Sequence, residues 1–321
     1  MLLSIVLPVY NVEAYLPKCI ESCENQDLSK SDYEVIIVID GSPDHSIDVA
    51  KQYQLSFDNI KIVTKKNGGQ SSARNTGLEV ASGSYVWFVD PDDFIEENIL
   101  GRIIKKLHDG DLDILWIDWQ DIDENGNIIS PFAPHAYCDN NTVMKGTEFM
   151  SKVLNNYLYA WCFIYRRSFL LEHALRFTEG MYYEDADFAF RSLPLVRRIQ
   201  RYKKICYNYL QRENSTVHHT DMRKLKDISK NCVTATNALR TCEQSLKRFY
   251  QICFTSFYML FLKEVLKSKN KGYANFLMTE TQLYSFGRVS LFGNFKTKLI
   301  GMFYNLFGVR ATLRILGFLI K

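Results

Sequence analysis

The chain has 321 residues, of which 47% are hydrophobic and 23% are charged, and its formal net charge is +3. This composition is typical of an ordinary globular protein, and the length predicts one large domain with an appendage. The positive charge belongs to residues 281–321, which hold six basic side chains and no acidic one. The first 280 residues therefore carry a net charge of −3.

Hydropathy and cysteine usage exclude further classes. No segment reaches the ~18 uninterrupted apolar residues of a membrane-spanning helix, and no signal-peptide pattern opens the chain. The eight cysteines are scattered, and no second pair at metal-site spacing follows Cys19 and Cys23. We therefore expect reduced thiols in a cytoplasmic protein, and no nucleic-acid partner.

The first ninety residues alternate between strand and helix patterns. Continuous apolar runs predict buried strands at 2–9, 33–39 and 85–89, and residues 61–65 are predicted to form a short strand. Apolar spacing of three to four residues predicts helices at 12–24 and 47–53. This order predicts a parallel sheet with helices on its faces.

Polar residues follow the ends of these strands. Asp90, Asp92 and Asp93 come directly after the strand at 85–89, and Pro91 forces a turn between the first two. Carboxylates at this spacing can converge on a divalent cation that shares its ligands with substrate phosphates. The alternative interpretation is a polar turn after a buried strand. Because Asp40 ends another strand at the same edge, the edge is suited to a nucleotide.

A glycine-containing segment at 67–77 precedes the strand at 85–89 and opens a helix that carries Arg74. Its two adjacent glycines let the backbone approach a ligand closely. The glycine spacing matches neither a dinucleotide fingerprint nor a P-loop, which disfavours both of those sites.

The second half of the chain is less regular. Its patterns predict strands at 113–117 and 204–210 and helices at 147–154, 224–247 and 249–267. Four acids gather at 179–187, among aromatic residues. Desolvation in such a setting can raise the pKa of a carboxyl group and make it a base near neutrality. The alternative is that these acids form the first turn of a helix at 188–195.

Taken together, these motifs resemble the inverting glycosyltransferases of family 2. They are the run from Ser4 to Asn11, Asp40-Gly41-Ser42, the segment at 67–77, Asp90 to Asp93, Glu184-Asp185, and Arg212 to Ser215. The resemblance covers about residues 1–216. It implies the α/β GT-A fold, with a Rossmann-like, mostly parallel sheet, helices on both faces and a C-terminal helical region. The implied domains are a catalytic domain at 1–220, with a nucleotide-sugar half at 1–110 and an acceptor half at 111–220, and a helical region at 221–321.

The same resemblance implies roles for individual residues. Asp40 would accept a hydrogen bond from the donor base, commonly uracil, which favours a UDP-sugar. Asp90 would contact the ribose or the metal region. Asp92 would bind Mn²⁺ or Mg²⁺ through the diphosphate. Asp185 would be the base that deprotonates the acceptor hydroxyl. The residues implied to shape the nucleotide cradle are Pro8, Tyr10, Gly69 and Arg74.

Two departures refine this expectation. Cys162 and Phe163 stand where members of the family often have Asn and Lys. The segment at 211–215 lacks the Trp of processive members, so we expect transfer of one sugar per encounter to a glycan or lipid-linked acceptor in surface polysaccharide biosynthesis.

The tail at 281–321 has apolar residues every three or four positions with basic residues between them, as in a helix that binds an anionic membrane surface peripherally. The alternative is a helix packed on the protein or in an oligomer interface.

Two other functions stay open. A sugar nucleotidyltransferase would need an N-terminal Gly-rich, Arg-containing loop, which residues 11–14 do not offer. A non-catalytic scaffold that binds nucleotide or membrane is disfavoured by the presence of Asp92 and Asp185.

Overall fold

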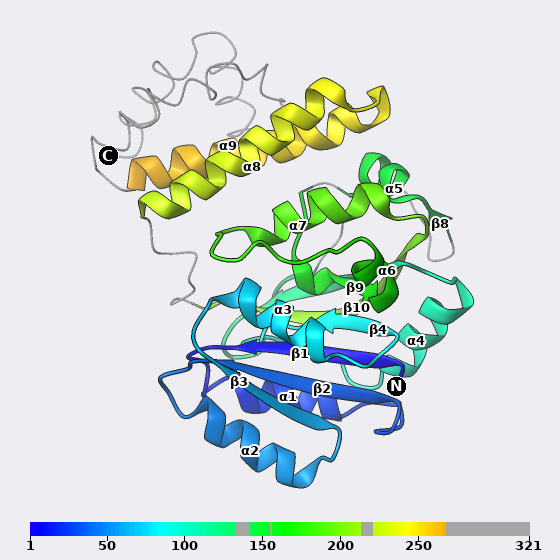
Figure 1. Ribbon diagram of the computed structural model, residues 1–321, viewed down its shortest axis with the longest axis vertical. Coiled ribbons are helices and arrows are strands. Elements are labelled where there is room, and N and C mark those ends of the chain that lie inside the picture. Colours follow the sequence, from blue (N-terminus) through cyan, green and yellow to red (C-terminus); the bar gives the residue numbers. More distant parts are fainter. Residues whose placement is uncertain (132–141, 155, 213–220, 268–321) are drawn as a thin grey trace. The chain divides into compact units, whose positions relative to one another are not determined.

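The computed structural model describes residues 1–131, 142–154, 156–212 and 221–267 (Figure 1). Its helices are α1 (Leu16–Glu24), α2 (Ser46–Ser56), α3 (Gln70–Val80), α4 (Leu100–Asp109), α5 (Gly146–Lys152), α6 (Arg167–Glu172), α7 (Glu184–Ser192), α8 (Met222–Thr241) and α9 (Lys247–Lys267). Its strands are β1 (Leu3–Val9), β2 (Tyr33–Asp40), β3 (Ile60–Lys65), β4 (Tyr85–Phe88), β5 (Phe94–Ile95), β6 (Ile114–Ile122), β7 (Ile128–Pro131), β8 (Val143–Met144), β9 (Phe163–Arg166) and β10 (Ile199–Leu210).

The chain divides into two compact units. The first comprises residues 1–152, 158–180 and 184–215, and the second comprises 153–157, 181–183 and 216–321. The first unit holds the sheet. The described part of the second consists mainly of α8 and α9.

The described strands of the first unit form one sheet in the order β3-β2-β1-β4-β9-β6-β10-β5, with β7 beside β6 and β8 beside β10. The pairs β1/β2, β1/β4 and β2/β3 are parallel, as is β6/β10. Strand β9 runs antiparallel to both β4 and β6 and so joins the two parallel parts. The expected α/β fold with a sheet of mainly parallel character is confirmed.

Helices cover both faces of the N-terminal part of the sheet, as expected. Figure 1 shows α1 and α2 on one face and α3 on the other. The connections explain this placement, because the chain moves outward from β1 to β3 and then returns across the sheet to β4. Right-handed crossovers in opposite directions put their helices on opposite faces. The order therefore reverses between β1 and β4, where open α/β sheets bind their ligands.

Close packing of α3 on β1 depends on a glycine. A Cβ atom added at Gly77 would lie 2.2 Å from Cγ1 of Val6. No side chain fits at that distance, so only glycine lets α3 approach β1 this closely. The close approach places the first turn of α3 beside the carboxyl ends of β1 and β2.

In the second unit, α8 and α9 pack against one another. Asp221 caps α8 by accepting a hydrogen bond from the backbone N–H of Lys224 at 2.7 Å. Lys224 of α8 and Glu264 of α9 form an ion pair at 3.4 Å, and each side chain is 1% exposed. None of the helices that the structure describes is long and apolar enough to cross a membrane.

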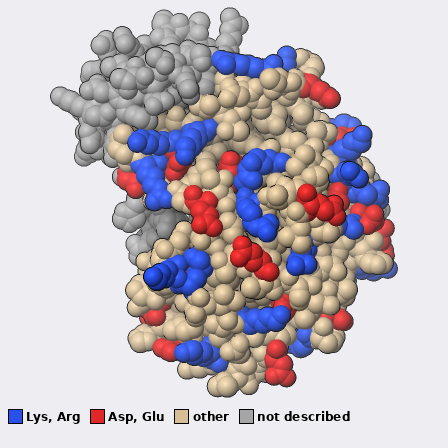
Figure 2. All heavy atoms as spheres, viewed as in Figure 1, with Lys and Arg blue, Asp and Glu red and all other residues tan. Residues whose placement is uncertain are grey.

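Basic and acidic side chains are interspersed over the face drawn in Figure 2, and neither sign dominates it. The notable concentration of charge lies instead within the first unit, at the carboxyl ends of the parallel strands. The predicted membrane-binding tail at 281–321 and the residues 213–215 of the last family motif lie outside the described residues.

Candidate active site

The loop after β4 carries the three carboxylates that the sequence singled out, and the structure separates their roles. Asp93 is 2% exposed. Its Oδ2 accepts a hydrogen bond from the Tyr207 hydroxyl at 2.7 Å, and its Oδ1 accepts one from the Leu210 N–H at 2.8 Å. The same hydroxyl accepts a hydrogen bond from the Asp90 N–H at 3.1 Å. Asp93 therefore fastens the loop to β10.

Asp90 and Asp92 are more open, with side chains 18% and 21% exposed. Oδ1 of Asp90 accepts hydrogen bonds from Gln70 Nε2 at 2.9 Å and from Arg74 Nη2 at 2.8 Å. Oδ2 of Asp90 has no donor among the described residues. Asp92 pairs with Arg212 at 2.5 Å. Burial raises the pKa of Asp92, and so does the charge of Asp90, while Arg212 opposes the shift.

These two carboxylates fit the divalent cation that the sequence predicts. No cluster of three or more metal-binding side chains occurs in the part of the chain that the structure describes. Mg²⁺ needs no such cage, because it usually binds through one or two carboxylates and completes its shell with water and substrate phosphates. Oδ2 of Asp90 and the carboxylate of Asp92, two residues further along the chain, could supply these ligands. Carboxylate oxygens are suitable ligands for Mn²⁺ as well.

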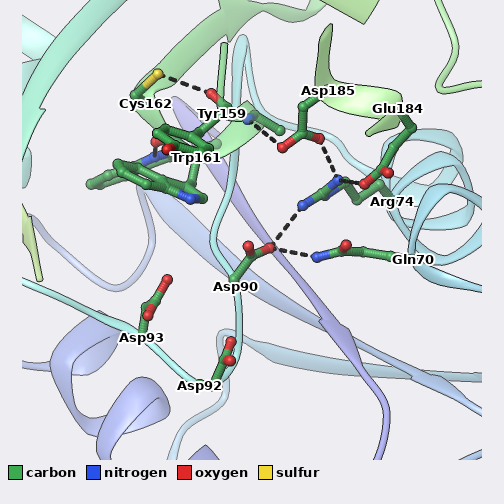
Figure 3. Close-up of polar contacts among 12 residues, drawn as sticks. Gln70, Arg74, Asp90, Asp92, Asp93, Tyr159, Trp161, Cys162, Glu184 and Asp185 are labelled. Atoms are coloured by element: carbon green, nitrogen blue, oxygen red, sulfur yellow. Dashed lines mark hydrogen bonds and ion pairs between the residues drawn. The ribbon is translucent and has the colours of Figure 1, made fainter. Parts of the chain in front are cut away.

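Arg74 brings the loop after β4 together with the start of α7 (Figure 3). Its guanidinium is 1% exposed, and its Nη1 donates to Glu184 Oε1 and Asp185 Oδ1, both at 2.8 Å. Oδ2 of Asp185 accepts a hydrogen bond from the backbone N–H of Ala160 at 3.1 Å. One buried cation thus faces three carboxylates, those of Asp90, Glu184 and Asp185.

The pKa values of the two acids on α7 reflect this setting. Burial raises the pKa of Glu184 to about 7, the charge of Asp185 adds to the shift, and Arg74 opposes it. Burial likewise raises the pKa of Asp185, again against the effect of Arg74. Glu184 and Asp185 form the first turn of α7, and they also lie beside the buried guanidinium of Arg74. Action of Asp185 as a base stays a prediction.

Asp40 at the end of β2 holds the predicted nucleotide cradle. Its carboxylate accepts hydrogen bonds from the N–H groups of Gly68, at 2.9 Å, and Gly69, at 2.7 Å, and from Lys65 Nζ at 2.6 Å. Gly69 has a φ of +85°, a conformation that favours glycine. The described partners of Asp40 leave about one of its four lone-pair sites for a base. Recognition of the base by Asp40 stays a prediction.

Pro8 and Tyr10 lie at the end of β1, where the order of the strands reverses. Pro8 is buried within β1, and Tyr10 just beyond it is half-exposed. The backbone N–H of Asn11 donates to Ser42 Oγ at 2.7 Å, which ties this loop to the one that follows Asp40. The structure thus brings Tyr10, Asp40, Gly69 and Asp90 to one edge of the sheet.

An aromatic stack lies beside Asp93 and Asp185, and no local pattern in the sequence indicates its geometry. The ring centroids of the stacked pair Trp161 and Tyr207 lie 4.3 Å apart, and those of the stacked pair Tyr159 and Trp161 lie 5.0 Å apart. Cys162 and Phe163, which depart from the family pattern, are both buried. Neither is placed to contact a substrate in this structure.

Several partners of the site could not be found from spacing. Gln70 lies one helical turn before Arg74, so the pair was detectable as an i, i+4 face of α3. Arg212, Lys65 and Tyr207 reach the site through pairings between distant segments, for which the sequence has no local signal.

Comparisons with known proteins identify the family of the chain. The family model described as "Glycosyl transferase family 2" matches residues 4–173, which is more than half of the chain. The chain is 31% identical over 220 residues to the uncharacterized glycosyltransferase EpsJ of Bacillus subtilis, covering 67% of this chain and 62% of EpsJ.

A second relative and a solved structure extend the comparison. Over 117 residues the chain is 41% identical to the minor teichoic acid biosynthesis protein GgaB of B. subtilis, covering 36% of this chain and 13% of GgaB. The chain therefore spans less than two thirds of the length of EpsJ and of GgaB.

Crystal structures of Staphylococcus aureus TarS 1–349 in complex with UDP and with UDP-GlcNAc match with TM-scores of 0.72 and 0.70 at 20% identity. Both matches cover 98% of this chain and 90% of TarS 1–349, and at this identity they show a shared fold. On the extent of the family match, the chain belongs to glycosyl transferase family 2.

Proposed function

We propose that the chain is an inverting, metal-dependent glycosyltransferase that moves one sugar from a UDP-sugar to a hydroxyl group of a glycan or lipid-linked acceptor. The observation that carries this proposal is the position of Asp185. The Arg74 guanidinium donates hydrogen bonds to both Asp185 and Asp90, although 95 residues separate these two acids in the sequence. A carboxylate suited to hold a donor and a carboxylate suited to accept a proton thus share one site.

The donor half of the site would be formed by the strand ends. Tyr10, Asp40 and the backbone of Gly69 would receive the nucleoside, with Pro8 shaping the end of β1. Asp90 and Asp92 would hold Mn²⁺ or Mg²⁺. When bound, such a cation neutralises the negative charge that develops on the departing diphosphate.

The acceptor half would depend on Asp185. The acceptor oxygen forms a bond to the anomeric carbon while the bond between that carbon and the diphosphate oxygen breaks. The hydroxyl proton passes to Asp185, and the electron pair leaves with the nucleoside diphosphate. Attack from the face opposite the leaving group inverts the anomeric carbon. Burial raises the pKa of Asp185, which makes it a more effective base near neutral pH.

The comparisons support the choice of donor and pathway. TarS was solved with UDP and with UDP-GlcNAc, and GgaB is named for teichoic acid biosynthesis. We therefore place the acceptor in a cell-surface polymer, with the reaction on the cytoplasmic side. Peripheral binding of 281–321 to an anionic membrane remains a prediction about residues that the structure does not describe.

Calorimetric titration of UDP into the protein with and without Mn²⁺ tests this proposal. We expect binding that depends on Mn²⁺ and that falls to the metal-free level in Asp92→Ala. Because Asp92 also pairs with Arg212, Asp92→Asn is a second variant that keeps the volume of the side chain. Asp58→Ala, at an exposed position away from the site, is the matched control.

Other outcomes would correct different parts of the proposal. If GDP, CDP or TDP binds with metal and UDP does not, the predicted pairing of Asp40 with uracil is wrong, while the mechanism stands. If no nucleotide binds under any condition, the catalytic proposal fails.

A further inference from the structure

Arg74 connects the donor side of the site with the base. Its Nη2 contacts Asp90 after β4, and its Nη1 contacts Glu184 and Asp185 at the start of α7, all at 2.8 Å (Figure 3). All four residues belong to the first compact unit. The described polar contacts of Arg74 are thus with carboxylates, whereas the family resemblance implied a place in the nucleotide cradle.

The guanidinium is itself held in place. It is 1% exposed, and its carbon lies 5.1 Å from the centre of the Phe177 ring. Gln70 precedes Arg74 by one turn of α3 and donates to the same oxygen of Asp90 at 2.9 Å. Side chains four residues apart share one face of a helix, so α3 presents both donors to Asp90. Oδ1 of Asp90 is therefore held by two donors from α3, one of which is Arg74.

Asp185 is held from two sides. Arg74 donates to its Oδ1, and the backbone N–H of Ala160 donates to its Oδ2 at 3.1 Å. An ionised carboxylate offers about four lone-pair sites in all. Arg74, the Ala160 N–H and a hydrogen bond with the Glu184 carboxyl group occupy three of them, which leaves about one site for a proton. These contacts fix the plane of the carboxylate without using up its capacity as a base. A base oriented by a third group is a recurring feature of catalytic sites.

We propose that Arg74 is a positioning residue that orients Asp185 for proton transfer and ties this orientation to Asp90. The inference rests on the proposed function and gives Arg74 a role toward the base. If donor binding moves the Asp90 carboxylate, the Arg74 guanidinium, which bonds to both acids, would move Asp185 as well. Arginine suits this task because its planar fork can bridge two partners, whereas the lysine ammonium is a single point of charge.

Arg74→Lys in the full chain tests the inference. We expect the release of UDP from UDP-GlcNAc with Mn²⁺ to slow by about 10²-fold, the usual effect of a small misplacement of a catalytic group. We expect the Kd for UDP to stay near the wild-type value. Arg191→Lys is the control, because Arg191 lies on α7 and pairs with Asp187 away from the site. Unchanged turnover would contradict the inference. Weaker binding of UDP with turnover retained would also contradict it and would indicate that Arg74 acts in nucleotide binding.

Chemical rescue separates positioning from general damage to the fold. Arg74→Ala removes the guanidinium, and added ethylguanidinium is expected to restore part of the turnover, whereas neutral ethylurea is not. Equal recovery with both additives, or with neither in a variant that still binds UDP, would contradict the inference.

A measurement on the donor-free protein keeps this test independent of activity. In a double-mutant cycle of Arg74→Lys and Asp185→Asn, we expect coupling of about tenfold in the unfolding equilibrium constant. Absence of coupling would overturn the inference. Failure of the wild-type protein to bind UDP or turn over UDP-GlcNAc, with the coupling present, would count against the proposed function alone.

Discussion

Glu34 provides a prediction about stability that depends on one buried carboxylate. It lies near the start of β2 and is fully buried. Ser4 Oγ and the Ser82 N–H donate to its Oε1 at 2.6 and 2.7 Å, and Lys61 Nζ lies 2.5 Å from its Oε2. Burial favours the neutral form, but Lys61, Ser4 and Ser82 outweigh it and lower the pKa from 4.5 to about 2.

The size and sign of the effect follow from this shift. A difference of about 2.5 units between the unfolded and folded states corresponds to about 3 kcal/mol of stability. Because the pKa is lowered on folding, this stability is present above pH 4.5 and is lost as the pH falls toward 2. Glu34→Gln should therefore be about 3 kcal/mol less stable at pH 7, and the gap to wild type should close as the pH falls through this window.

Urea unfolding at a series of pH values, followed by tryptophan fluorescence, measures the gap. The four tryptophans, at positions 87, 116, 119 and 161, all lie in the same compact unit as Glu34, so the signal reports on that unit. Glu79→Gln is the control, because Glu79 is exposed on α3, and its effect should be within about 0.5 kcal/mol. A gap that stays constant between pH 7 and pH 3 would mean that packing, and not charge, is responsible.

Three further variants test other parts of the molecule. Asp185→Asn should lower turnover by about 10² to 10⁴, the range for loss of a general base, and keep the calorimetric affinity for UDP; unchanged turnover would remove Asp185 from that role. Asp40→Asn should cost about 1–3 kcal/mol in urea unfolding, because it replaces a buried carboxylate that accepts from Gly68, Gly69 and Lys65 by an amide that cannot accept all three bonds, and it should weaken UDP binding. Gly77→Ala should cost about 1–3 kcal/mol by forcing α3 away from β1, and an unchanged unfolding midpoint would contradict that packing argument.

The N-terminal half of the fold could be predicted from the sequence because its signals are local. Long apolar runs mark β1 and β2, and each of the first three strands is followed by a turn and a predicted helix. The predicted helix at 12–24 begins later than expected, at Leu16. Asn11 has a φ of +55° and bonds to Ser42, so the chain turns before the helix starts, and a proline stands at the first helical positions.

The middle of the sheet could not be predicted in the same way. Strand β9 has four residues, too few for a period-two pattern to separate it from a short helix. Its place between β4 and β6 depends on pairing with segments about 50 to 80 residues away, such as Trp87 with Ile164. The helix expected at 188–195 begins at Glu184 instead, which includes the acids in its first turn.

The candidate site shows the same division between local and distant information. Asp90, Asp92 and Asp185 were identified from motifs, and the structure brings them near one another. Their counter-ions could not be read from spacing, since Arg74 meets Asp185 across 111 residues and Arg212 meets Asp92 across 120. The sequence showed which acids matter, but only the fold shows which cations they share.

The pKa values of buried carboxyl groups are shifted in opposite directions at the two edges of the sheet, and this difference bears on function. At the amino edge, Glu34 has enough donors to lower its pKa. At the carboxyl edge, burial outweighs the available donors and raises the pKa values of Asp92 and Glu184. A fold selected for stability alone would not collect such acids, and perturbed pKa values cluster at functional sites for this reason. Because this edge is short of positive charge, it favours a cationic ligand, which agrees with the proposed metal-bound donor diphosphate beside a carboxylate base.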